Sequence, residues 1–435
     1  MKVSRLGAFA VGAALAFGAC NSGATTAPAS GGANPSGASK GTFKIGTELP
    51  MSGAETANGE PTANGVKLAI KQANAKGTVP GYTLDINVQD DAVNGAHDPL
   101  QGATNMHTLV ADASVVGVVG PFNSSVAQSE IPISNAAGLL QCSPANTNTG
   151  LTYPPDSLKY RPNNADKINY IRTAAPDSIQ GPAGADYVYN DLKATSVYIL
   201  DDTETFGVGV GDSFAKQFEK DGGKVTKRDS APKSTTDYTP LFTAAAAGHP
   251  AAVYLAGTTP TGMGLALKQG RTVAGFESIP FMGPDGVADL GPGGTKGATI
   301  TVATAAAHDV YGTVAGIHDL PSGSTFVADY TAAYGGAPGA YSAAGYACAQ
   351  VIIAGIAKAV TAGTTDPAAV REAVRAAATA AGNKFDTVVG SISFDKNGDI
   401  TTPFMSFYKV DLTAAGGKGD WVYVKQQAFT DPNAQ

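Results

Sequence analysis

Short runs of β-branched and aromatic residues alternate with longer stretches of helical periodicity along most of this chain. The first run, FKIGTEL at 43–49, is followed by residues 64–75, whose apolar positions recur at helical spacing, and then by a second β-type run at 82–89. This order predicts a β-α-β unit. The alternation continues through 115–119, 125–137 and 138–142. We therefore expect a parallel sheet with helices on both faces.

A second set of alternating runs begins near residue 180 and predicts a second α/β domain. It contains β-type runs at 196–200, 224–228 and 251–256, with a helical stretch at 209–221 between the first two. Helical periodicity then covers residues 344–360 and 367–381. No internal repeat is present, which disfavours solenoids and propellers.

The segment SISFDKNGDI at 391–400 carries a turn signal. Asn397-Gly398 between alternating apolar residues predicts a tight hairpin turn. The segment is not a calcium loop, because the twelfth position counted from its first Asp is Ser406, where a bidentate Glu is needed.

The N-terminus has the parts of an export signal. Lys2 and Arg5 precede an apolar run at 6–17, which is too short to span a bilayer, and Gly18-Ala19-Cys20 follows. Cys20 after small residues resembles the lipobox of bacterial lipoproteins, in which the Cys is acylated, although Phe stands where the pattern usually has Leu. The alternative is a plain signal peptide that is cut just before Cys20. Residues 21–40 hold almost no large apolar side chain, which predicts a flexible tether.

Composition indicates a globular chain without a nucleic-acid partner. Of the 435 residues, 43% are apolar, and the 54 Gly show no period of three. The formal net charge is −7 with 15% charged residues, so there is no basic footprint for nucleic acid. Because an exported chain occupies a compartment in which disulfides persist, Cys142 and Cys348 either pair or remain two buried thiols.

Eight short motifs occur in a constant order. They are IGTELPMSG at 45–53, KQANAKG at 71–77, GYTLDINVQDD at 81–91, GVVGPFNSS at 117–125, SPANT at 143–147, RTAAPDSIQGPA at 172–183, FMGPDGV at 281–287 and FDKNGD at 394–399. With them the chain resembles the leucine/isoleucine/valine-binding proteins, which are type I periplasmic binding proteins, over nearly its whole mature length.

The resemblance implies an α/β fold of two doubly wound parallel-sheet lobes joined by three crossovers. We expect the crossovers near 172–177, 301–305 and 385–389. Lobe 1 would contain residues 41–174 and 304–386, and lobe 2 residues 175–303 and 387–430. A ligand would lie in the cleft between the lobes, and its contacts would stabilise hinge closure.

An amino acid in such a cleft needs donors for its carboxylate, acceptors for its ammonium group and apolar walls. Ser124 and Ser125 open a helix after a strand, where they either bind a carboxylate or simply cap the helix. By resemblance, Ala145 supplies a carbonyl to the ammonium group, and Thr147 supplies a hydroxyl and an N–H. Asp285 matches the acidic partner of the ammonium group, where Glu is common; it is otherwise an ordinary loop carboxylate.

The resemblance also implies the walls of the pocket. Phe206 stands where a Tyr often packs over the ligand, Tyr341 matches an aromatic wall of the first lobe, and Phe122 lies beside the Ser pair. Each of these is otherwise a core residue. Asn58 and Thr258 replace aromatic side chains of leucine-type members, which would widen the cleft and make it more polar, so the ligand need not be leucine.

No enzyme motif competes with a binding function. The five His show no metal-binding spacing, and neither a GxSxG elbow nor a Walker loop is present. We therefore expect neither catalysis nor a metal nor a cofactor. The resemblance implies a monomeric exported protein, at the cell surface or in the periplasm, whose partners are a small molecule, the permease subunits of an ABC importer and the membrane, through a lipid anchor. A ligand-sensing receptor of the same fold is the alternative.

Overall fold

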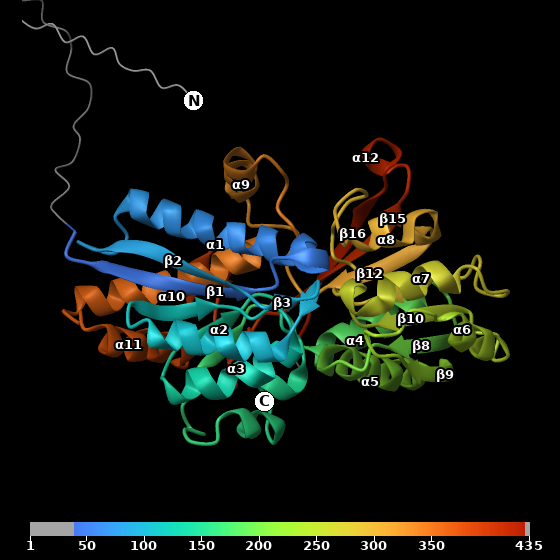
Figure 1. Cartoon of the computed structure of the whole chain (residues 1–435), viewed down its shortest axis with the longest axis horizontal. Coiled ribbons are helices and arrows are strands. Elements are labelled where there is room, and N and C mark those ends of the chain that lie inside the picture. The colour runs from blue at the N-terminus through green and yellow to red at the C-terminus, as the bar shows by residue number, and fades with distance from the viewer. Residues whose placement is uncertain (1–38, 431–435) are drawn as a thin grey trace, which may run out of the picture. The chain divides into compact units, whose positions relative to one another are not determined.

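The computed structural model describes residues 39–430. The export signal, the acylation expected at Cys20 and nearly all of the tether lie outside these residues. The described strands form two main sheets, each flanked by helices (Figure 1). We refer to the part around the five-stranded sheet as lobe 1 and to the part around the seven-stranded sheet as lobe 2.

Lobe 1 is built on a parallel sheet in the order β2-β1-β5-β6-β7. Its strands are β1 (Thr42–Leu49), β2 (Thr83–Asp90), β5 (Val115–Val119), β6 (Gln141–Ser143) and β7 (Tyr170–Arg172). β1 and β2 pair over eight residues, from Thr42 opposite Thr83 to Leu49 opposite Asp90. Parallel pairing requires long crossovers, which the helical segments between the strands supply.

Helices cover both faces of this sheet. One face carries α1 (Thr56–Lys76), α10 (Ser342–Thr361) and α11 (Pro367–Thr379), whose apolar residues share one core, and α9 (Phe326–Tyr334) packs beside them. The other face carries α2 (Pro99–Ala111) and α3 (Ser124–Ala136). Figure 1 shows α1, early in the chain, beside α10, which is late. Lobe 1 is therefore assembled from two distant parts of the sequence.

Among the described residues, α10 is long and apolar enough to cross a membrane, with a mean hydropathy of 1.5. It packs against α1 and α11, and its apolar side chains belong to the lobe 1 core. A disulfide joins its residue Cys348 to Cys142 of β6, across 206 residues of sequence, with the two Cα atoms 5.5 Å apart. These contacts make α10 a core helix of the lobe.

Lobe 2 is built on the sheet β16-β15-β12-β11-β10-β8-β9. Five strands are parallel, namely β8 (Ser196–Asp201), β9 (Lys224–Ser230), β10 (Ala252–Ala256), β11 (Phe281–Gly283) and β12 (Val310–Val314). The last two, β15 (Phe404–Asp411) and β16 (Asp420–Ala428), are antiparallel and extend one edge. The helices are α4 (Asp177–Asp186), α5 (Thr205–Lys220), α6 (Thr239–Ala246), α7 (Gly264–Gly270), α8 (Thr299–Ala303) and α12 (Ala414–Gly417).

The chain passes between the lobes three times, and two of the passages lie later than expected. The first follows β7, within the expected range. The second follows β12, because Val310–Val314 pairs with strands of lobe 2, so residues 304–314 do not belong to lobe 1. The third follows Ile400, whose side chain still packs in the lobe 1 core, so residues 387–400 do not belong to lobe 2.

Two small ribbons complete the described strands. One consists of β3 (Ala92–Val93) and β4 (Ala96–His97), and the other of β13 (Phe385–Thr387) and β14 (Gly390–Ile392). The expected turn at Asn397-Gly398 is present. The Asp395 carboxylate accepts hydrogen bonds from the backbone N–H groups of residues 397, 398 and 399, which closes the turn.

Candidate functional site

A small cavity lies between the two lobes, at the carboxyl ends of their parallel strands. Lobe 1 contributes Phe122, Asn123, Ser124, Ala145 and Thr147, and lobe 2 contributes Phe206, Thr258, Asp285 and Gly286. These residues follow β5, β6, β8, β10 and β11, where parallel α/β sheets commonly bind ligands. The cavity has a volume of about 20 Å³. By a measure in which one water needs roughly 10–15 Å³, it holds about one water.

The amino end of α3 faces this cavity. Ser124 begins the helix and is 2% exposed, and its Oγ accepts a hydrogen bond from the backbone N–H of Asn148 at 3.3 Å. The preceding Asn123 makes no side-chain cap, and its Oδ1 is buried without a hydrogen-bond partner in the described part of the chain. Helix amino ends attract anions because their first N–H groups lack partners within the helix. This end therefore suits a ligand carboxylate.

Hydrogen bonds from Ser143 and Arg172 fix the position of the loop that carries Ala145 and Thr147. Ser143 Oγ accepts from the backbone N–H of Asn146 at 2.9 Å, and the guanidinium of Arg172 donates to the carbonyl of Asn148 at 2.8 Å. Arg172 is fully buried and forms an ion pair with Asp399 at 2.5 Å. The loop is thus tied to the turn that precedes the third crossover, and it has little freedom to move within lobe 1.

Asp285 is the only charged side chain among the described residues that line the cavity. Its carboxylate accepts a hydrogen bond from Gln180 Nε2 at 2.9 Å and another from the hydroxyl of Tyr341. Burial raises the pKa of Asp285 to about 6, and these hydrogen bonds oppose the rise. Above that pH the cavity holds a carboxylate without a cationic partner of its own.

A second buried carboxylate, Asp177, was not singled out from the sequence. It begins α4 and is 1% exposed. Burial raises the pKa of Asp177 to about 8; the interaction with the Thr147 side chain opposes the rise, and the negative charge of Asp285 adds to it. Its backbone N–H donates to the carbonyl of Thr147 at 2.7 Å. In the sequence it has only the ordinary signature of an acidic residue at a helix start.

The aromatic side chains close the cavity from both lobes. Phe206 is 9% exposed at the start of α5, and it packs so near Gly286 that a Cβ there would lie 3.0 Å from its ring. From lobe 1, the ring of Phe122 meets that of Tyr341 edge to face, with 5.4 Å between centroids. Thr258 is 8% exposed, and its hydroxyl contacts that of Thr261 at 2.9 Å.

Three of the expected residues do not line the cavity. Tyr341 lies directly behind it and reaches it through Asp285. Ser125 is on the first turn of α3, with its Oγ buried and without a hydrogen-bond partner among the described residues. Asn58 lies on α1, 9% exposed, and has no part in the lining. The expectation that Asn58 widens the ligand cleft stays a prediction.

The lobes touch around the cavity. The side-chain amide of Asn148 donates to the carbonyl of Thr205 at 3.0 Å, and the hydroxyl of Thr205 donates to Gln128 Oε1 at 3.1 Å. The contact between Tyr341 and Asp285 also crosses from one lobe to the other. We call this the closed arrangement. Within residues 39–430, no group of three His, Cys, Asp or Glu side chains is placed to hold a metal ion.

Comparison with known proteins finds a matching family model and relatives that are named as amino-acid-binding proteins. Residues 42–418 match a family model described as periplasmic binding protein. The chain is 29% identical over 368 residues to the Leu/Ile/Val-binding protein BraC3 of Rhizobium johnstonii. The aligned region covers 84% of this chain and 90% of that protein. It is 28% identical over 364 residues to the leucine-, isoleucine-, valine-, threonine- and alanine-binding protein of Pseudomonas aeruginosa, with 82% and 87% covered.

Solved structures share the fold. The leucine-binding protein LivK of Thermotoga maritima superimposes with a TM-score of 0.71 at 24% identity, covering 89% of this chain and 99% of that one. A solute-binding protein of an ABC transporter from Rhodopseudomonas palustris, in complex with 3,4-dihydroxybenzoic acid, gives 0.69 at 21% identity, with 90% and 99% covered. The same fold thus serves proteins whose ligands differ in chemistry.

Proposed function

Because the chain belongs to the periplasmic binding protein family, we propose that it is an extracytoplasmic solute-binding protein that captures a small amino acid between its lobes and delivers it to an ABC importer. Relatives named for Leu, Ile, Val, Thr and Ala binding support this class of ligand. The family consists of binding proteins, and we propose that this chain likewise has no catalytic activity.

The observation that carries the proposal is the opposite polarity of the two sides of the cavity. Ser124 and the amino end of α3 offer donors for a carboxylate on one side, and Asp285 offers an acceptor for an ammonium group on the other. The described lining contains no Lys, Arg or His. An α-amino acid satisfies both sides, whereas an aromatic acid would leave the Asp285 carboxylate buried without a counter-charge, which is costly.

The size of the cavity indicates how the ligand enters. A space that holds about one water cannot admit an amino acid, so the lobes must separate about the three crossovers and then close on the ligand. The short contacts of Thr205 with Asn148 and Gln128 would break in the opening step. We propose a short side chain on the ligand, because Phe122 and Phe206 occupy the walls in the closed arrangement.

A binding screen tests this function. The twenty amino acids, benzoate and 4-hydroxybenzoate are each added to the purified protein, and the change in melting temperature is followed by isothermal titration calorimetry of any compound that raises it. We expect saturable binding of at least one aliphatic amino acid and none of either benzoate. Binding of a benzoate in the absence of any amino acid ligand would contradict the proposed charge pairing.

We further propose that the protein is exported and anchored to the membrane through Cys20, and that it is a monomer. The export signal in the sequence and the membership in a periplasmic family support export. Incorporation of radiolabelled palmitate into the full chain, and its loss in Cys20→Ser, would establish the anchor. Light scattering from the purified protein gives the mass, and a mass twice that of the chain would refute the monomer.

A further inference from the structure

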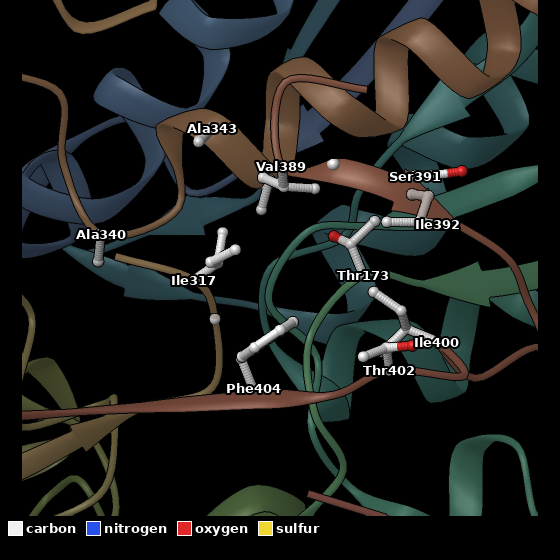
Figure 2. A pocket seen from close by; sticks show the side chains of 13 residues that line it. Thr173, Ile317, Ala340, Ala343, Val389, Ser391, Ile392, Ile400, Thr402 and Phe404 are labelled. Atoms are coloured by element: carbon white, nitrogen blue, oxygen red, sulfur yellow. The ribbon is translucent and has the colours of Figure 1, made fainter. Parts of the chain in front are cut away.

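A second cavity, of about 240 Å³, lies where the three crossovers meet. Thr173 of the first crossover, Ile317 of the second and Thr402 of the third all contribute to its wall. Figure 2 shows that Ile317, Val389 and Phe404 approach the same space from three different segments. None of its lining residues lines the inter-lobe cavity. We call it the hinge cavity.

The wall of the hinge cavity is mostly apolar and uncharged. None of the described residues that line it is Asp, Glu, Lys, Arg or His, and its polar side chains are the hydroxyls of Thr173, Ser391 and Thr402. Such a wall rejects ions, because a buried charge without a partner is costly. A cavity of about 150 Å³ with an apolar wall binds benzene, so this larger one accommodates a two-ring molecule.

A short segment around Tyr341 connects the hinge cavity to the inter-lobe site. Ala340 and Ala343, at the start of α10, line the hinge cavity, and Tyr341 lies between them. The Tyr341 hydroxyl donates to the Asp285 carboxylate and accepts from the backbone N–H of Ala315 at 3.2 Å. A molecule that fills the hinge cavity therefore contacts the same turn that holds the lobes together at Asp285.

The cavity also depends on the angle between the lobes. Ile392 and Ala343 belong to lobe 1, whereas Phe404 begins a strand of lobe 2. When the lobes rotate about the crossovers, these walls must shift relative to each other. A molecule that fits the present shape has different contacts in the open arrangement, and this difference in affinity is what shifts a conformational equilibrium.

We propose that the hinge cavity is a binding site for a small, uncharged, largely hydrocarbon molecule, and that its occupation favours the closed arrangement of the lobes. This site is distinct from the one that binds the transported solute, and it does not rest on the identity of that solute. Its effect on solute affinity would be reciprocal, because linkage requires each ligand to change the affinity of the other by the same factor.

Indole is a suitable probe, since it is neutral, has two fused rings and carries a single N–H donor. Calorimetry and saturation-transfer NMR with the full chain should show one saturable indole site. Val389→Asp places a carboxylate in the wall and should weaken binding tenfold or more, whereas Val389→Ile keeps the wall apolar and should retain it. Thermal unfolding of both variants establishes that they are folded. Absence of saturable binding, or equal binding by Val389→Asp, would overturn the site.

The effect on the lobes is measured separately, without any amino acid. Spin labels at the exposed positions Thr108 of lobe 1 and Lys216 of lobe 2, in a Cys20→Ser background, report the distance between α2 and α5. Indole should shift the distance distribution toward shorter values, and Val389→Asp should abolish the shift. An unchanged distribution at saturating indole would refute the coupling. Because no solute is added, the outcome does not depend on the amino-acid screen.

Discussion

Replacing Asp285 with Asn should stabilise the unliganded protein while it weakens ligand binding. Burial raises the pKa of Asp285 from its ordinary 3.8 to about 6. The folded state therefore holds this proton more tightly than the unfolded chain does, and stability falls as the pH rises from about 4 to about 6. At 1.36 kcal/mol per pKa unit, the ionised carboxylate costs about 3 kcal/mol at neutral pH. Asn avoids this cost.

The hydrogen-bonding partners of Asp285 allow its replacement by Asn. Asn can still accept the hydrogen bond from Gln180 through its oxygen, and its NH₂ group can donate to the hydroxyl of Tyr341, which then acts as the acceptor. Urea unfolding without ligand should show a gain of about 1–3 kcal/mol at pH 7.5. The gain should vanish below about pH 4, where the wild-type carboxyl is protonated in both states.

Ligand affinity should change in the opposite direction. Loss of the charge that faces an ammonium group costs about 2–4 kcal/mol, which is a fall of roughly 30- to 1,000-fold in affinity by calorimetry with the amino acid found in the screen. Asp289→Asn is the matched control. Asp289 is also buried, with its pKa raised to about 6, but it bonds to Thr299 and does not line the cavity. Its replacement should leave affinity unchanged.

Two results would refute this reasoning. If Asp285→Asn binds the amino acid as tightly as the wild type, Asp285 does not face the ligand. If the unliganded variant is less stable than the wild type at pH 7.5, the hydrogen bonds from Gln180 and Tyr341 outweigh the cost of burying the charge.

Three further predictions concern stability. Asp177→Asn should raise the free energy of unfolding by about 4–6 kcal/mol at pH 8 and make it less dependent on pH between 4 and 8, because burial raises the pKa of Asp177 to about 8; urea unfolding across this range measures both effects. Cys348→Ser should lower the free energy of unfolding by up to about 5 kcal/mol, since the disulfide closes 206 residues, and reduction of the wild type should match it in urea. Asp399→Ala should cost about 3–5 kcal/mol in the same assay, because it leaves Arg172 buried without its partner.

The periodicity of the chain predicts the type and order of most elements, because long helices and buried parallel strands have strong patterns. The lobe boundaries were harder to predict. β11 has only three residues, too few to display a pattern, and the expected second passage near 301–305 comes from the family resemblance and precedes β12. The expected third crossover near 385–389 coincides with the ribbon β13–β14, yet Phe385 and Ile392 pack in the lobe 1 core. Such packing is decided by distant parts of the chain.

The candidate site was accessible from sequence where a residue directly follows a predicted strand. This holds for Ser124, which follows the predicted strand at 115–119, whereas Thr147 and Asp285 were expected from the family resemblance. The carboxyl ends of the strands bring all three together. Asp177 was missed because burial leaves no mark in a sequence. The pairing of Cys142 with Cys348 stayed open for a similar reason, since it depends on α10 packing over β6.

The antiparallel strands β15 and β16 mean that lobe 2 receives its last sheet strands from residues 404–428, after the chain has left that lobe once and returned. Lobe 1 likewise lacks α10 and α11 until residue 379 has been made. Neither lobe can therefore complete its core until most of the chain has been synthesised. For the exported protein proposed above, the chain would therefore stay threadable through a narrow secretion channel for most of its synthesis.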